Sequence, residues 1–298
     1  MFETAVDSPR AAGLMAPART GRHERTLVAW PTDREVWGAH RDRAVDEYAA
    51  LVAAIAPFEP VTVVADPARA AEASERCGAL PAVDVLEIPI DDSWIRDSGP
   101  IYLVGGAGGR AVTQFGFNAW GGKYMPYDRD ADLPRRLAEA TQTRRYTSDL
   151  VMEGGGFTVD GEGTLITTES VVLNDNRNPG WTRERAEQAL RDATGAETIL
   201  WLAHGLAEDR DTDGHSDNVV QFAAPGRVVV QVTPDHEPLA VDFIRHDLFL
   251  AASRINDRHG PSRHRFNGRD TKMFLFRGIL IGVKPISGRM PVNRCATV

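Results

Sequence analysis

Residues 26–65 read TLVAWPTDREVWGAHRDRAVDEYAALVAAIAPFEPVTVVA, and this stretch contains the pattern that decides the fold. An apolar run at Thr26–Trp30 is followed by apolar residues spaced three or four apart between positions 45 and 55, and then by a second apolar run at Val61–Ala65. Short apolar runs favour buried strands, and the wider spacing favours one face of a helix. The stretch therefore predicts a strand–helix–strand unit, the building block of α/β proteins.

The same alternation of strand and helix patterns continues through most of the chain. Further strands are expected at Asp84–Ile90, Gly163–Thr168 and Thr198–Leu202, helices at Pro67–Cys77, Asp130–Thr141 and Thr182–Thr194, and hairpins around GGAGG (105–109) and Pro225-Gly226. Pro134 is expected in the first turn of its helix, where proline is tolerated. Residues 272–286 could form one strand, although a solvated or irregular end is the favoured reading of the chain after Arg254. The chain is predicted to be mixed α/β with repeated structural units, although its sequence has no clear repeat.

Composition narrows the class of protein. The chain has 298 residues, of which 42% are hydrophobic and 26% are charged, as is typical of a soluble globular protein. Its apolar runs are shorter than a membrane-spanning helix, and its first residues lack the pattern of a secretory signal. We therefore expect a cytoplasmic protein without a membrane partner. The net charge of −8 disfavours nucleic acid as a partner and is compatible with a cationic ligand.

The charge changes sign near Arg254. Residues 254–298 carry a net charge of +8, whereas residues 1–253 carry −16. The basic end has no clear periodicity outside residues 272–286. We therefore predict a catalytic domain over residues 1–253 and a divergent basic segment over residues 254–298.

Three polar segments can carry chemistry, and the first is Asp91–Pro100, DDSWIRDSGP. It places three carboxylates and Trp94 directly after a predicted strand. A carboxylate can accept two parallel N–H bonds from a guanidinium group, and an aromatic face attracts a cation. The segment therefore indicates a site for a planar cation, with a solvated acidic turn as the alternative.

The second segment is Glu153-Gly-Gly-Gly156, in which a carboxylate adjoins glycines that let the backbone approach a ligand closely. Its alternative reading is a simple turn or bulge. Neither this run nor GGAGG matches a phosphate loop or a dinucleotide fingerprint.

The third segment is Asp209–Asn218, DRDTDGHSDN. If this stretch is extended, His215 and Asp217 point to one face, and the carboxylate raises the imidazole pKa, as a general acid requires. The start imitates a calcium loop, but the twelfth position is Val220 instead of Glu. A zinc pair has no third ligand in any motif. No metal is therefore predicted, and a surface acidic loop remains the alternative.

The chain has two cysteines, which are too few for a disulfide framework or a Cys-only zinc site. Cys77 is predicted to be a structural thiol at the end of a helix. Cys295 follows Arg294, whose charge favours the thiolate, but it lies close to the end of the sequence, where functionless cysteines are common.

Taken together, these segments resemble the agmatine deiminase family of guanidino-group modifying enzymes, which is related to bacterial peptidyl-arginine deiminases. The resemblance covers about residues 15–235. Its motifs occur in family order: HERT leading to AWP (23–31), DDSWIRDSGP (91–100), FNAWGGKY (117–124), EGGG (153–156), GEGTLITTESVVLNDNRNP (161–179) and DTDGHSDN (211–218).

The resemblance implies a pseudo-fivefold α/β propeller of ββαβ-type units and the hydrolysis of agmatine to N-carbamoylputrescine and ammonia. It also implies a small cationic guanidino substrate and no cofactor, and it leaves the oligomeric state open. By this resemblance, Asp97 and Asp217 grip the guanidinium group and His215 is the general acid and base. Three further residues are expected to line the substrate pocket: Asp91, Trp94 and Glu153.

The resemblance also implies a cysteine nucleophile in a Gly-Gly-Gly-Asn-Ile-His-Cys segment near the C-terminus. This sequence has only Asn293-Arg294-Cys295 there, so Cys295 is the candidate nucleophile and the last propeller unit is expected to be incomplete or divergent. Three alternatives stay open: an inactive guanidinium-binding protein, a peptidyl-arginine deiminase-like enzyme, and a metal-dependent hydrolase.

Overall fold

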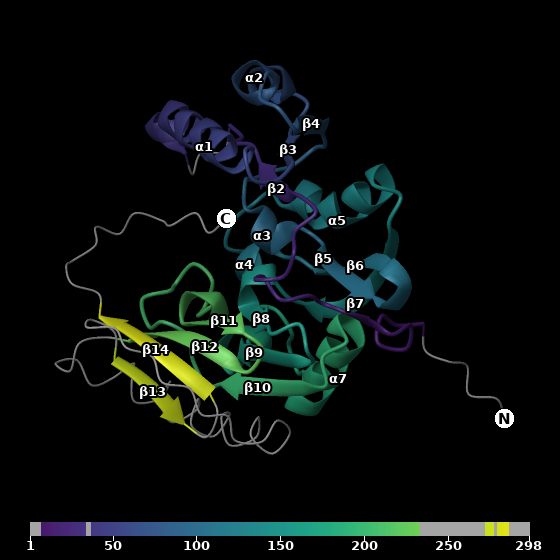
Figure 1. Ribbon diagram of the computed structural model, residues 1–298, viewed down its shortest axis with the longest axis vertical. Helices are drawn as coiled ribbons and strands as arrows, with labels where there is room; N and C mark the ends of the chain where they lie inside the picture. Colours follow the sequence, from purple (N-terminus) through teal and green to yellow (C-terminus); the bar gives the residue numbers. More distant parts are fainter. Residues whose placement is uncertain (1–6, 34–36, 233–271, 277–278, 286–298) are drawn as a thin grey trace.

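The computed structural model describes residues 7–33, 37–232, 272–276 and 279–285. Within these residues, four β-sheets lie around the short helices α3 (Ile95–Ser98) and α4 (Ala119–Gly122), and longer helices pack on the outer sides (Figure 1). The predicted mixed α/β class is confirmed. None of the described helices is long and apolar enough to cross a membrane.

The first sheet contains the predicted strand–helix–strand stretch of residues 26–65. Its strands are parallel, in the order β2 (Thr26–Ala29), β3 (Val61–Ala65) and β4 (Val83–Glu87), and they are connected by α1 (Arg41–Ile55) and α2 (Ala70–Cys77). Helix α1 buries Val45, Tyr48 and Val52 against the sheet, as the spacing predicts. Helix α2 begins three residues later than expected, and β4 ends at Glu87 instead of Ile90.

The other three sheets share one order of pairing: an antiparallel pair, then a parallel strand. The three sets are β5 (Ile101–Gly105), β6 (Arg110–Gly116) and β7 (Arg144–Val151); β8 (Phe157–Val159), β9 (Thr164–Thr168) and β10 (Thr198–Leu202); β11 (Val220–Ala224), β12 (Arg227–Val232) and β14 (Ile279–Pro285). The short β1 (Leu14–Met15) pairs with β5. Both predicted hairpins are confirmed, and the repeated order is the structural repetition that the sequence indicated.

Helix α7 (Arg183–Thr194) follows its sequence signals closely. The Thr182 side chain accepts a hydrogen bond from the Arg185 backbone N–H at the start, and Gly195 ends the helix with a left-handed conformation (φ 73°). Its apolar face packs with α6 (Glu169–Val172) and β9 in one core cluster.

Helix α5 (Asp128–Ala140) corrects one prediction. It begins two residues before Asp130, so Pro134 lies in the second turn instead of the first. Proline there removes one intrahelical hydrogen bond. Leu133 and Leu137, both fully buried, pack beneath β2 and β3 and hold the helix in place.

Residues 272–286 form neither an irregular end throughout nor one strand. Two antiparallel strands, β13 (Lys272–Phe276) and β14, occupy this range, with Phe276 opposite Ile279.

The described part of the chain also contains four single-turn 3-10 helices: η1 (Gly38–His40), η2 (Gly106–Gly108), η3 (Gly154–Gly156) and η4 (Ser216–Asn218). Helix α3 contacts η3, and η3 contacts η4. The three motif segments singled out from the sequence therefore meet, although they are separated by about 60 residues each.

Candidate active site

Asp97 is held in place by its neighbours. It lies in α3, which begins five residues after Ile90; Ile88 and Ile90 follow β4 and are buried against α5. Its Oδ2 accepts a hydrogen bond from the Trp120 indole N–H at 3.0 Å, and its Oδ1 accepts one from the Gly155 backbone N–H at 2.9 Å. The carboxylate therefore has a fixed orientation and still has lone pairs for a ligand.

His215 is the residue around which the site is organised, with 3% of its surface exposed. Its Nδ1 lies 3.8 Å from Asp97 Oδ1, and its Nε2 lies 3.3 Å from Glu153 Oε2. Burial alone lowers the pKa of His215, but the carboxylates of Asp97, Glu153 and Asp217 outweigh burial and raise the pKa to about 9. The imidazole is therefore protonated at neutral pH.

Glu153 lies behind His215 and is fully buried. Its two oxygens accept hydrogen bonds from Arg177 Nε at 2.9 and 3.0 Å, and Arg177 Nη1 also pairs with Asp213 at 2.6 Å. Burial opposes ionisation of Glu153, yet the contacts with His215 and Arg177 lower its pKa. The ionised carboxylate therefore fixes the orientation of the histidine ring and its proton.

Asp217 reaches the same place from η4. An extended stretch was the condition under which His215 and Asp217 would point to one face, but residues 216–218 form a turn of 3-10 helix that follows His215 directly. The Asp217 Oδ2 accepts a hydrogen bond from Arg19 Nη2 at 3.2 Å. Burial and the charge of Asp97 raise the pKa of Asp217, while His215, Arg19 and Arg96 oppose that rise.

Gly155 marks the point where these side chains converge. A Cβ atom at this position would lie 2.5 Å from His215 Nδ1, 2.8 Å from Asp97 Oδ1 and 3.1 Å from Asp217 Oδ2. Real Cβ atoms essentially never approach other atoms as closely as the first two distances, so His215 and Asp97 need a glycine here. This gives EGGG a physical function that composition alone did not reveal. Two carboxylates and one imidazole facing a single point suit a planar cation with several N–H donors.

The remaining predicted pocket residues are placed differently. Trp94 stacks on Trp37 with ring centroids 6.2 Å apart and lines a cavity beside the site. Asp91 caps α5, because its Oδ2 accepts a hydrogen bond from the Arg129 backbone N–H at 2.9 Å. Both Asp91 and Glu153 are thus bound within the protein, and their predicted contacts with a substrate stay predictions.

The structure bears on the prediction for one of the two cysteines. Cys77 is fully buried in the core formed by α1, α2 and the first sheet, and burial raises the pKa of its thiol. The expectation of a structural thiol agrees with this position. Cys295, the candidate nucleophile, lies outside the described residues. No group of three or more His, Cys, Asp or Glu side chains in the described part of the chain could hold a metal ion.

Several residues of the site were not found from the sequence. Arg177 lies in the segment GEGTLITTESVVLNDNRNP (161–179), but nothing in its neighbouring sequence indicates that it pairs with Glu153. Arg19 precedes its partner Asp217 by 198 positions. Trp120 has a left-handed backbone (φ 56°), an unusual conformation for a tryptophan that aims its indole N–H at Asp97.

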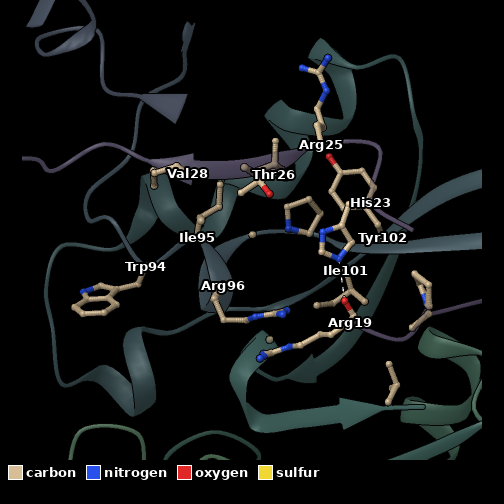
Figure 2. A pocket seen from close by; sticks show the side chains of 18 of the residues that line it. Arg19, His23, Arg25, Thr26, Val28, Trp94, Ile95, Arg96, Ile101 and Tyr102 are labelled. Carbon is tan, nitrogen blue, oxygen red and sulfur yellow. Dashed lines mark hydrogen bonds between the residues drawn. The ribbon is translucent and has the colours of Figure 1, made fainter. Parts of the chain in front are cut away.

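A cavity of about 480 Å³ adjoins the site and runs along β2 and α3 (Figure 2). Its lining includes Arg19, His23, Arg25, Trp94 and Arg96. The triad of Asp97, His215 and Asp217 does not line it, so Arg19 is the side chain that both lines the cavity and contacts the triad.

Comparison with known proteins defines the class. Residues 15–251 match the model of the Porphyromonas-type peptidyl-arginine deiminases. The chain therefore belongs to this family, as its motifs indicated.

Among individual relatives, the chain is 42% identical over 237 residues to the agmatine deiminase of Pseudomonas aeruginosa strain LESB58. The alignment covers 78% of this chain and 64% of that protein. It is 40% identical over 238 residues to a putative agmatine deiminase of Streptomyces avermitilis, with 77% and 68% covered. The fold is similar to the structure of the Enterococcus faecalis agmatine deiminase, with a TM-score of 0.78, 30% identity, and 84% and 70% covered. The chain thus spans less than two thirds of the length of the Pseudomonas enzyme.

Proposed function

We propose that this chain binds a small guanidino compound, with agmatine as its substrate, and that it is built for agmatine deiminase chemistry. The single observation that supports this most is the convergence of Asp97, His215 and Asp217 around Gly155. Agmatine is chosen because the relatives named above are agmatine deiminases. A cytoplasmic location and the absence of nucleic acid partners remain parts of this proposal.

The proposed reaction uses each residue in turn. Asp97 and Asp217 accept N–H bonds from the guanidinium and fix its carbon for attack by a thiolate. A carbon–sulfur bond forms, and protonated His215 gives its proton to the nitrogen that leaves as ammonia. Water then attacks the amidino–sulfur carbon while neutral His215 accepts a proton. N-carbamoylputrescine leaves, and the thiolate is regenerated. The high pKa of His215 suits the first step, because it holds the proton at neutral pH.

The thiol is the part of the mechanism that the described residues do not supply. Cys77 is buried in the first sheet's core, so Cys295 remains the proposed nucleophile. The alternative is a protein that binds guanidino compounds without turnover. This alternative is favoured by the absence of a thiol beside the site in the described part of the chain, which does contain the guanidinium contacts and the proton donor.

The domain arrangement is part of the proposal. Three sheets repeat one order of pairing, which supports a propeller of ββαβ-type units. In the remaining sheet, β2 pairs only with β3 among the described strands. In the other three sheets, the strand in the position of β2 also pairs with an antiparallel strand on its other side. We propose that a further unit of the propeller lies at this edge of β2 and completes the ring. We propose that residues 1–253 form the catalytic domain, with residues 254–298 as its divergent end.

One pair of measurements distinguishes an active agmatine deiminase from a protein that binds guanidino compounds without turnover. Agmatine binding is measured by calorimetry and ammonia release is measured with agmatine and with an arginine-containing peptide, using the wild-type chain and Cys295→Ser. We expect agmatine to bind to both, and ammonia release from agmatine only with the wild type. Binding without ammonia in either chain would establish the second reading.

A glycine substitution tests the location. Gly155→Ala puts a methyl group where the three side chains converge, so agmatine binding should be lost. Gly106→Ala is the matched control, because a Cβ there meets nothing within 4 Å. If Gly155→Ala folds and binds agmatine normally, the proposed site is wrong.

A further inference from the structure

Two guanidinium groups lie together at one end of the cavity. Arg96 projects from α3 and Arg19 comes from the segment between β1 and β2, and Figure 2 shows their side chains running alongside each other. Burial and the charge of Arg19 lower the pKa of Arg96 to about 10, with Asp217 and Asp97 opposing. Like charges in a partly enclosed space repel each other and favour a counter-ion between them.

The hydrogen-bond donors of this pair are largely unused. A guanidinium has five N–H donors. Arg19 gives one hydrogen bond, to Asp217, whereas Arg96 makes no hydrogen bond or ion pair with any described residue. Because both side chains line the cavity, these unused donors are available to a ligand there.

The rest of the cavity wall adds no negative charge. Among the described residues that line it there is no Asp or Glu, and the polar ones are neutral or basic: Arg19, His23, Arg25, Thr26, Ser93, Arg96, Tyr102 and Thr158. His23 pairs with Glu59 and Arg25 pairs with Asp84, while Arg19 pairs with Asp217 at 3.2 Å. Among the described residues that line the cavity, Arg96 is therefore the guanidinium without an ion pair, and Arg19 lies beside it.

We propose that this cavity is an anion-binding site, in which Arg96 and Arg19 hold a small oxyanion of the carboxylate or phosphate type. The planar fork of a guanidinium matches two oxygens of such a group. The triad residues Asp97, His215 and Asp217 do not line this cavity, so anion binding there does not depend on the proposed reaction, while its coupling to a guanidino ligand rests on the proposed function.

The position of Arg19 couples the two sites. Its guanidinium contacts Asp217 and so competes with a guanidino ligand for that carboxylate. An oxyanion that draws Arg19 toward the cavity frees Asp217. The anion and the guanidino ligand should therefore strengthen each other's binding, because thermodynamic coupling is reciprocal.

The direct test is calorimetric titration of the full chain with inorganic phosphate and with acetate, at constant ionic strength set by chloride. We expect saturable binding of one anion, weakened at least tenfold in Arg96→Met and in Arg19→Met. Arg96→Lys, which keeps the charge and loses the fork, should bind at least threefold more weakly if Arg96→Met does not fold. Arg43→Met removes an exposed charge on α1 and is the matched control. Equal binding in the wild type and both Arg96 variants, or equal weakening in Arg43→Met, would overturn the proposal.

A second comparison identifies the source of the anion. If the carboxylate belongs to the guanidino ligand itself, L-arginine binds the wild type more tightly than agmatine does, and Arg96→Met removes the difference. If the anion is separate, phosphate or acetate tightens agmatine binding severalfold in the wild type and not in Arg96→Met. The coupling between the two sites is refuted if arginine has no advantage and neither anion changes agmatine binding, whereas the anion site itself stands or falls on the direct titration. Failure of ammonia release would not affect this result, since both arms measure binding alone.

Discussion

Substituting Glu153 with glutamine should lower the pKa of His215. The change is nearly isosteric and removes only the charge. In the wild type, Glu153 Oε2 lies 3.3 Å from His215 Nε2, and both groups are buried. A hydrogen bond to a charged group contributes about 1.5–3 kcal/mol, and one pKa unit corresponds to about 1.36 kcal/mol. The pKa of His215 should therefore fall from about 9 by roughly one to two units.

The same change alters how stability depends on pH. The pKa of folded His215 is raised above its ordinary value of 6.5, so the stabilisation from protonation is complete below about pH 6.5 and is lost as pH rises through 9. The unfolding free energy of the wild type should therefore decrease between pH 6.5 and 9, and Glu153→Gln should show a smaller decrease. The pKa of Glu153 is lowered, so its own contribution is constant over this range.

The assay is a histidine NMR titration, with the His215 signal assigned from its loss in His215→Asn. Urea unfolding at pH 6, 7.5 and 9 measures the second effect. Glu47→Gln, at an exposed ion pair on α1, is the control and should leave both unchanged. An unaltered His215 pKa in a folded Glu153→Gln protein would refute the claim that Glu153 holds the imidazole in its charged form.

Three further changes have expected outcomes. Asp97→Asn should weaken agmatine binding at least tenfold in calorimetry, because a neutral amide replaces a charged acceptor; retained affinity would contradict the role given to Asp97. Cys77→Ala should lower the unfolding free energy by about 1–2 kcal/mol in urea while leaving agmatine affinity unchanged, since the thiol packs in the first sheet's core. Thr182→Ala should cost about 1 kcal/mol by removing the N-cap of α7, whereas Thr182→Ser should cost much less; equal losses would argue against the cap.

The sequence predicted the regular elements well where local signals agreed. Val61–Ala65 forms a strand with the predicted bounds, and Thr182 and Gly195 bracket α7 as expected. The predicted bounds were wrong where one residue type is compatible with two positions in a helix. Pro134 is compatible with the first or the second turn of a helix, and α5 begins two residues earlier than predicted, at Asp128.

The candidate site shows a different limit. Asp97 and His215 occur in conspicuous motifs, but the role of Glu153 depends on Arg177, which lies 24 positions away and is fully buried. The glycine at position 155 was recognised only as permitting a close approach, and its neighbours could not be named. Side-chain chemistry was therefore predictable from composition, whereas pairing between distant segments required the structure.

The contact between Arg19 and Asp217 has a consequence for folding. It closes a loop of 198 positions, and Gly155 and Asp97 connect two further segments to the same point. Contacts of such large sequence separation form slowly, because the entropy of loop closure is lost before they can stabilise the chain. The local units, such as β2–α1–β3, can form without these contacts. The binding site should therefore be among the last regions to become ordered, and the recovery of ligand binding after dilution from urea should lag behind the recovery of helical circular dichroism.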